Sequence, residues 1–307
     1  MKEQKISIIV PVNKKEIQDG DLCDLYRIQE EICGQTYKNT EILWIIPADV
    51  GNDLSFLESH RSHVLVAKDS NLAKMYNLGL ERAQGEYVMF WHIRLKAVKN
   101  YIFDMYQMMM HKHCHLVCSS YGIKKAVYQE HQVYSWEEYL KKLTQNPHHD
   151  FYGVLWNKLY DMNLIRQNSL TFSEKVTSGY DFIFNMQYLN QKISVGILGK
   201  ELIHLSKEDT EDNTEDVYKV LIDRLNDKNA MFAAYKFLFW RGKVEVGKEV
   251  LDEYMIKTAA LELAGVLFPF SYKQWSVIRK KCLQDNGITG KKTTLKVIKL
   301  ALRLRGR

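Results

Sequence analysis

The first ninety residues alternate between short apolar segments and helical segments, and this alternation limits the fold more than any other feature of the chain. Residues 5–12 and 41–46 are apolar, β-branched runs that stop at Pro11 and Pro47, so each predicts a buried strand rather than a helix. A helical segment at about 20–33 lies between them and ends before a glycine, which predicts a helix C-cap. The predicted order is therefore strand, helix, strand.

The same order then repeats. Residues 64–66 and 86–91 predict two further strands, and residues 71–84 predict the helix between them. Alternation of this kind builds a mainly parallel sheet covered by helices on both faces. Ligands of such sheets bind at the carboxyl ends of the strands, and His92 directly follows the fourth strand. The sequence thus predicts an α/β fold with its site at that edge.

The composition suits one large domain with an appendage. The chain has 307 residues, and 46% of them are apolar, which is ample for a sizeable core. The N-terminus lacks the apolar segment of a secretory signal, no apolar run reaches the length of a membrane span, and the five cysteines are widely scattered. We therefore expect a cytoplasmic protein with reduced thiols. We place an α/β domain at 1–207 and a helical region at 208–307.

The helical region ends in a strongly basic segment at 291–307. One predicted stripe holds Leu295, Ile298, Leu302 and Arg305, and another holds Lys292, Lys296, Lys299 and Arg303. A basic amphipathic helix of this kind suits an anionic membrane surface, but it could equally pack on its own domain with a solvated basic face. Binding to nucleic acid is not expected, because the segment comes with no recognition motif or aromatic platform.

Four segments resemble the bacterial family 2 glycosyltransferases, in order and at familiar separations: IIVPV at 8–12, QTYKNTEI at 35–42, NLGLERAQGEYVMF at 77–90 and LWNKLY at 155–160. The resemblance covers about two-thirds of the chain. It implies a GT-A fold, in which a nucleotide-binding half precedes an acceptor-binding half. It also implies inverting transfer of a sugar from a nucleotide-sugar donor to a glycan or glycoconjugate acceptor, as in polysaccharide biosynthesis.

The chain departs from the family where active members bind a divalent cation. Their Asp-x-Asp motif aligns with His92, Ile93 and Arg94, so the motif is degenerate. Mg²⁺ prefers oxygen ligands, and an arginine cannot coordinate a cation. We therefore predict no metal or other cofactor, and we expect Arg94 with His92 to hold the diphosphate by charge-assisted hydrogen bonds. The resemblance adds Pro11, at the end of the first strand, as a donor contact.

A second donor motif follows the second strand. The family's acids that grip the base and ribose have their nearest counterparts in Asp49 and Asp53, an alignment that needs about two extra residues. An ungapped alignment instead leaves Ile46 and Pro47 at the acidic positions. We prefer the gapped alignment, which makes Asp49 and Asp53 donor-binding residues.

One carboxylate of the catalytic half is present. The resemblance aligns Asp181 with the family's general base and Tyr180 with the acid beside it. A single carboxylate is enough to take the proton of an acceptor hydroxyl. The alternative role for Asp181 is an N-cap of a helix over 182–191, and both roles can hold together.

The resemblance places acceptor contacts at Trp156, Asn157 and Lys158. It implies that these residues open a short helix, where Asn157 and Lys158 reach sugar or phosphate oxygens. The alternative is that Trp156, Leu159 and Tyr160, at helical spacing, pack that helix on the sheet. Packing accounts for the aromatic residues, whereas Lys158 is the expected contact.

One cluster of residues has the side-chain types of a zinc site: His111, His113, Cys114, His115 and Cys118. The pattern indicates the end of a helix followed by a strand over 115–119, in which alternate side chains face opposite sides of the sheet. We therefore assign no metal to this cluster.

Two functions follow from these patterns. Asp181 and the acceptor segment favour a metal-independent glycosyltransferase. Changes at three donor-contact places favour an inactive pseudo-glycosyltransferase that serves as a scaffold or partner of an active one; the third of these places is Tyr76, where the family has arginine. The expected partners are a nucleotide sugar, a glycan acceptor, a partner glycosyltransferase in the second case, and the inner face of the cell membrane if the basic tail binds lipid.

Overall fold

The computed structural model describes most of the first two-thirds of the chain and its C-terminal helix: residues 3–12, 23–50, 54–122, 132–145, 150–205 and 290–305, with single positions between 217 and 288. The chain divides into two compact units, Met1–Lys142 with His149–Asp212, and Leu143–His148 with Asn213–Arg307. The domain boundary that we placed at 207 stays a prediction. The helical region predicted to follow it lies largely outside the described residues.

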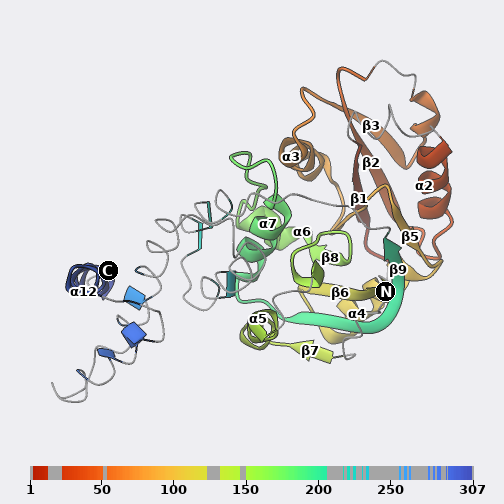
Figure 1. Cartoon of the computed structure of the whole chain (residues 1–307). Coiled ribbons are helices and arrows are strands. Elements are labelled where there is room, and N and C mark those ends of the chain that lie inside the picture. The colour runs from red at the N-terminus through yellow and green to blue at the C-terminus, as the bar shows by residue number, and fades with distance from the viewer. Residues whose placement is uncertain are drawn as a thin grey trace. The chain divides into compact units, whose positions relative to one another are not determined.

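One mixed sheet forms the first unit, and nine of its strands lie in the described residues (Figure 1). The strand order is β3-β2-β1-β4-β8-β6-β9-β5, and β7 pairs with β9 off this path. The first four strands are parallel: β1 (Ile6–Pro11), β2 (Thr40–Pro47), β3 (Ser62–Ala67) and β4 (Tyr87–Phe90). The predicted mainly parallel α/β sheet is confirmed.

The second half of the sheet contains both directions. Its strands are β5 (Leu95–Ala97), β6 (Leu116–Gly122), β7 (Gln132–Tyr134), β8 (Lys158–Asp161) and β9 (Val195–Leu205). Strand β8 runs antiparallel between β4 and β6, whereas β6 and β9 are parallel. Both β5 and β7 are antiparallel to β9.

Strand β8 corrects the helix that we expected to open at Trp156. The chain forms a turn there and enters β8 at Lys158. Leu159 and Tyr160 are fully buried, and β8 has a neighbouring strand on each side. A strand in the middle of a sheet buries both of its faces, so its apolar residues give no alternation to distinguish it from a short helix.

Helices cover both faces of the sheet, as predicted. Helix α3 (Leu72–Arg82) contacts β1, β2 and β3, and α4 (Tyr101–Lys112) contacts β6 and β9. Figure 1 shows α2 (Cys23–Cys33) and α3 on opposite sides of the parallel strands. The other helical segments of this unit are η1 (Ser55–Leu57), η2 (Asp150–Tyr152), α6 (Met162–Gln167) and α7 (Tyr180–Leu189), and α5 (Trp136–Gln145) belongs to it as far as Lys142.

Hydrogen bonds from residues of the segments 35–42 and 77–90 link the parallel strands. Glu41 of β2 is buried, and its carboxylate accepts hydrogen bonds from Ser7 Oγ of β1 at 2.5 Å and from the Gln84 N–H at 2.6 Å. Ser7 Oγ in turn accepts the Gly85 N–H at 2.8 Å. A buried carboxylate needs such partners to be tolerated, so this network fixes β1, β2 and the approach to β4 relative to one another.

Gly79 of α3 lies so close to Ile9 of β1 that an added Cβ would stand 2.6 Å from Ile9 Cγ2. Alanine in a helix interior is ordinarily more stable than glycine by about 0.5–1 kcal/mol, but overpacking a core typically costs about 1–3 kcal/mol. We therefore expect Gly79→Ala to lower the free energy of unfolding by about 1 kcal/mol in urea denaturation. This loss of stability should disappear when Gly79→Ala is combined with Ile9→Ala, which removes the contacting atoms. An increase in stability of Gly79→Ala alone would contradict the close contact.

Helix α12 (Lys291–Arg305) belongs to the second unit, where Val297 and Ala301 are fully buried in a small apolar cluster. The remaining buried members of the cluster are Ala259, Ala260, Leu263, Cys282, Leu283 and Ile288. Of the predicted apolar stripe, Ile298 is partly buried against this cluster, whereas Leu295 and Leu302 are exposed, because the helix packs through the side that carries Val297 and Ala301. Among the described residues, no helix combines the length and the apolar character needed to cross a bilayer.

Candidate functional site

The carboxyl ends of β2, β1 and β4 lie side by side at one edge of the sheet. Pro11, the last residue of β1, pairs with Ile45 of β2, and Phe90, the last residue of β4, pairs with Ile9. The chain leaves the sheet just beyond these pairs, so the segments after the three strands gather at one place.

Four of the predicted donor-binding residues lie at this edge: Pro11, Asp49, His92 and Arg94. Pro11 is buried, whereas Asp49 and Arg94 are exposed and His92 is half-buried. Asp53, the fifth, lies outside the described residues. The edge therefore combines an acid after β2 with a cationic turn after β4.

The turn after β4 is closed by a hydrogen bond of 2.9 Å from the Leu95 N–H to the His92 carbonyl oxygen. Ile93 is buried within it, and the Arg94 N–H donates to His92 Nδ1 at 3.1 Å. Because Nδ1 accepts this bond, a neutral His92 carries its proton on Nε2. The turn thus supplies an imidazole N–H donor and a guanidinium from adjacent positions.

Helix α2 holds this turn in place. Arg27 Nη2 donates to the Ile93 carbonyl oxygen at 2.8 Å, and Arg27 Nη1 donates to Glu31 Oε2 at 3.1 Å. Glu31 also accepts the backbone N–H of Ala97, on the other side of the turn, and burial raises the pKa of its carboxyl group. Sequence reasoning missed this role, because Arg27 and Glu31 are four residues apart and have the pattern of an ordinary surface ion pair.

The described side chains at this edge do not fit a divalent metal ion. Within the part of the chain that the structure describes, no three His, Cys, Asp or Glu side chains are grouped closely enough to hold one. At the turn itself the available groups are an imidazole and a guanidinium, not the oxygen ligands that Mg²⁺ requires. Phosphate oxygens, by contrast, suit both groups.

The histidine and cysteine cluster beyond α4 is dispersed. His115 Nδ1 is 3.0 Å from Ser194 Oγ and the residue is exposed, whereas Cys118 is fully buried with its sulfur 3.6 Å from the Tyr139 hydroxyl. The exposed His115 and the buried Cys118 thus lie in different surroundings, as expected for side chains that alternate between the two faces of a sheet.

Asp181 lies in the first turn of α7. The N-cap is Gly179, with φ of 69°, and Asp181 Oδ1 accepts the Phe182 N–H at 2.7 Å. The predicted capping role for Asp181 is therefore corrected by two positions, because a glycine adopts the left-handed backbone that starts this helix. A carboxylate in a first helical turn is stabilised by the helix dipole.

Asp181 is also linked to the end of β4 through aromatic rings. The ring of its neighbour Tyr180 lies 6.4 Å from that of Phe172, whose centroid is 5.4 Å from that of Phe90, the last residue of β4. Since β8 runs antiparallel to β4, its first residue, Lys158, lies toward the carboxyl end of β4. The half-buried Asp181 and the cationic turn therefore belong to the same edge of the sheet.

Asn157 and Lys158 are turned into the interior, with exposures of 0% and 1%. Lys158 Nζ donates to the carbonyl oxygens of Phe151 and Val154 at 2.7 and 2.5 Å and to Asn157 Oδ1 at 2.8 Å. Burial lowers the pKa of Lys158 to about 8, although Cys118 and Asp181 oppose this shift. Asn157 and Lys158 thus brace the turn before β8 through their side chains, and the direct acceptor contact that we expected of them stays a prediction.

Trp156 lies in the same turn and is largely buried. Its carbonyl oxygen accepts a hydrogen bond from Tyr101 Oη at 2.9 Å, and its ring packs edge-on against Tyr121 at 4.7 Å. Of the two alternatives for Trp156, acceptor contact and packing, these contacts support packing.

Tyr76 replaces the family's arginine with a buried ring. It stacks on Phe172 with ring centroids 4.8 Å apart and meets Phe90 edge-on at 5.3 Å. Its neighbour Asn77 accepts the Phe172 N–H at 2.8 Å and donates to Glu174 at 3.1 Å. These contacts tie α3 to the segment that precedes α7, and so help to position Asp181 indirectly.

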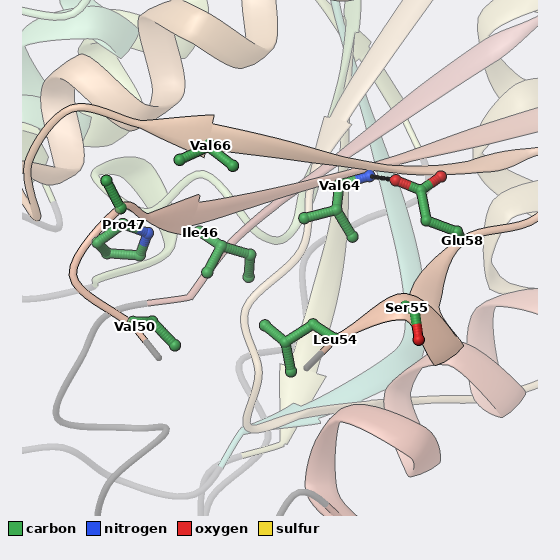
Figure 2. Close-up of a pocket in the computed structure, with 9 residues that line it drawn as sticks. Ile46, Pro47, Val50, Leu54, Ser55, Glu58, Val64 and Val66 are labelled. Carbon is green, nitrogen blue, oxygen red and sulfur yellow. Dashed lines mark hydrogen bonds between the residues drawn. The ribbon is translucent and has the colours of Figure 1, made fainter. Parts of the chain in front are cut away.

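Figure 2 shows a pocket of about 350 Å³ beside this edge. The loop that carries Asp49 forms one wall through Ala48 and Val50, and the other lining residues come from β2, β3 and the η1 region: Ile46, Pro47, Leu54, Ser55, Glu58, Val64 and Val66. Glu58 Oε1 accepts the Val64 N–H at 2.8 Å. The mainly apolar lining does not suit phosphate groups, which belong with the cations of the turn after β4.

The strand order and the flanking helices are those of a GT-A-like fold. No protein-family model and no curated protein matches the chain. Among solved structures, it is similar to S. aureus TarS 1–349, with a TM-score of 0.63 and 16% identity over 98% of this chain and 91% of that chain.

The same TarS region has been solved with UDP-GlcNAc, and that structure matches with a TM-score of 0.62, 16% identity and coverage of 98% of this chain and 92% of that chain. A longer TarS structure matches with a TM-score of 0.62 and 16% identity, over 98% of this chain but 55% of that chain. At this identity the similarity establishes the fold, and the GT-A architecture implied by the sequence resemblance is confirmed.

Proposed function

We propose that the protein binds a nucleotide sugar at the carboxyl edge of β2, β1 and β4 and transfers the sugar, with inversion, to a glycan or glycoconjugate acceptor. The proposal rests on one observation above all: the turn of His92 and Arg94 follows Phe90 of β4, and the segment that carries Asp181 is linked to Phe90 through the rings of Tyr180 and Phe172. The structural similarity to TarS solved with UDP-GlcNAc supports this choice of donor class.

The cationic turn would act on the leaving group. Negative charge builds on the nucleoside diphosphate as the bond to the sugar breaks, and a guanidinium can meet two phosphate oxygens at once. Arg94 would supply this group, and His92 Nε2–H a second donor. Arg27 Nη2 donates to the Ile93 carbonyl oxygen at 2.8 Å, so the turn is already held in place before the donor binds. Such preorganisation of charged groups is the condition for electrostatic stabilisation of a transition state.

Asp181 would act on the acceptor. One of its oxygens accepts the Phe182 N–H, and a carboxylate keeps further lone pairs for the proton of a sugar hydroxyl. The proton would move from that hydroxyl to the carboxylate as the oxygen attacks the anomeric carbon, and inversion requires this attack on the face opposite the leaving diphosphate.

A second candidate function is a scaffold that no longer turns over a nucleotide sugar. Tyr76 favours it, since an aromatic ring stacked on Phe172 occupies the place of the family's arginine. In this case the protein would serve as the partner of an active glycosyltransferase, and its GT-A-like surface would matter rather than its site.

Arg94→Ala tests the clamp. We expect the wild type to bind UDP and UDP-GlcNAc in EDTA, and Arg94→Ala to weaken binding about 10- to 150-fold, because a hydrogen bond to a charged group contributes about 1.5–3 kcal/mol. Isothermal titration measures this directly. Arg82→Ala is the matched control, since Arg82 is also exposed but lies in the last turn of α3, and its affinity should equal that of the wild type.

Three outcomes would count against the clamp. Equal affinities for wild type and Arg94→Ala would remove the role of the guanidinium, and binding that requires Mg²⁺ or Mn²⁺ would reinstate a metal. Failure to bind UDP, GDP, ADP or CDP, or UDP-GlcNAc, with or without metal, would favour the scaffold function.

A further inference from the structure

The two sides of α12 differ sharply. Val297 and Ala301 are fully buried, whereas the opposite side is exposed and carries only cations and leucines at its centre: Lys292, Leu295, Lys296, Lys299, Leu302 and Arg303. The helix contains no acidic residue between 291 and 305. Its positive charge is therefore not offset within the helix itself.

The exposed residues are ordered around the helix axis. At about 100° per residue, Lys292, Lys296, Lys299 and Arg303 form one basic stripe. Leu295 and Leu302 are seven residues apart and lie together along one margin of that stripe. They are 57% and 55% exposed, so apolar surface runs beside the charges for about two helical turns.

If this basic face were only solvated, Leu295 and Leu302 would keep apolar surface exposed to water, which is unfavourable in free energy. A nucleic acid would offer charge to the basic stripe but no apolar layer for the leucines. An anionic lipid surface offers both, because headgroups attract the cations and the region just below them accepts apolar side chains. Charge and apolarity thus point to the same partner.

We propose that the exposed face of α12 binds an anionic lipid surface, with Leu295 and Leu302 entering the headgroup layer. This inference is independent of the proposed sugar transfer, because none of these residues belongs to the edge of the sheet that carries His92 and Asp181. Titration of UDP-GlcNAc should therefore give the same affinity for every α12 variant described below.

Flotation of the full chain with vesicles tests the proposal. Wild type should float with vesicles of phosphatidylcholine and phosphatidylglycerol in a 7:3 ratio but not with phosphatidylcholine alone. Lys296→Glu with Lys299→Glu should reduce partitioning at least about 30-fold, since each cation near an anionic surface contributes on the order of 1 kcal/mol. Leu295→Ser with Leu302→Ser should reduce it about tenfold or more through lost apolar burial.

Lys112→Glu with Lys141→Glu is the matched control, because it makes the same charge change at exposed lysines of the first unit. It should float like the wild type. All four α12 positions are exposed, so thermal unfolding should be unchanged in both α12 variants.

The proposal is overturned if the wild type does not float with anionic vesicles or if the α12 lysine variant floats as well as the wild type. It is also overturned if the leucine variant keeps full binding, because the leucines would then not enter the lipid. Equal losses in the control would show that net charge, rather than this face, decides the binding, and would overturn it as well.

Discussion

Asp181→Asn is expected to slow sugar transfer by about 10²- to 10⁴-fold, the range that a positioned general base contributes. Asparagine has nearly the same shape, and its side-chain oxygen can still accept the Phe182 N–H that Asp181 accepts at 2.7 Å. It cannot take a proton from an acceptor hydroxyl. The rate of UDP release from UDP-GlcNAc, with water or added oligosaccharides as acceptors, measures the effect.

The control for this substitution is Asp161→Asn. Asp161 lies at the other end of β8 and caps α6 through a hydrogen bond from the Asn163 N–H, a role that asparagine performs equally well. Its activity should be unchanged. The affinity of Asp181→Asn for UDP should also be unchanged, because the base acts on the acceptor and not on the nucleotide. Full transfer activity in Asp181→Asn would rule out Asp181 as the base.

Lys158 is expected to make stability depend on pH. Burial lowers its pKa to about 8 in the folded protein, against 10.5 in the unfolded chain. Between these values the unfolded chain binds the proton and the folded protein does not, so the free energy of unfolding rises with pH across this window. The cost of burying the charge is present in full below pH 8, and its removal amounts to about 3 kcal/mol by the upper end of the window.

Urea denaturation between pH 7 and pH 10 measures this rise. In Lys158→Met the side chain has similar length but no titrating group, so the difference between the two pH profiles isolates Lys158 from the other titrating residues. The tyrosines whose pKa burial raises, such as Tyr160, act only toward the upper end of this range and act in both proteins. Parallel profiles would mean that Lys158 does not titrate from a buried, charged state.

The parallel part of the sheet could be predicted from sequence because its signals are local. Prolines end the apolar runs of β1 and β2, and those runs are too short for helices. The position of His92 and Arg94 at the edge followed from the same reasoning, since it needs only the end of β4 and the rule for parallel sheets.

The features that could not be predicted are those that distant segments of the chain decide. The burial of Lys158 depends on carbonyl oxygens of Phe151 and Val154, which no spacing in the sequence reveals. For α12, several apolar residues could have formed the buried stripe, and only contact with the rest of its unit selects Val297 and Ala301 over Leu295 and Leu302. Arg27 was missed for the same reason, because its partner at Ile93 lies 66 positions further along the chain.

The strand order also limits how the molecule can be divided in the laboratory. Strand β4 has β8 as its outer neighbour, and β5, which follows the cationic turn directly, pairs only with β9 in the described sheet. A fragment that stops before residue 150 would expose an apolar sheet edge prone to aggregation and would leave β5 without its partner strand. Expression trials aimed at a minimal nucleotide-binding module should therefore extend through Leu205.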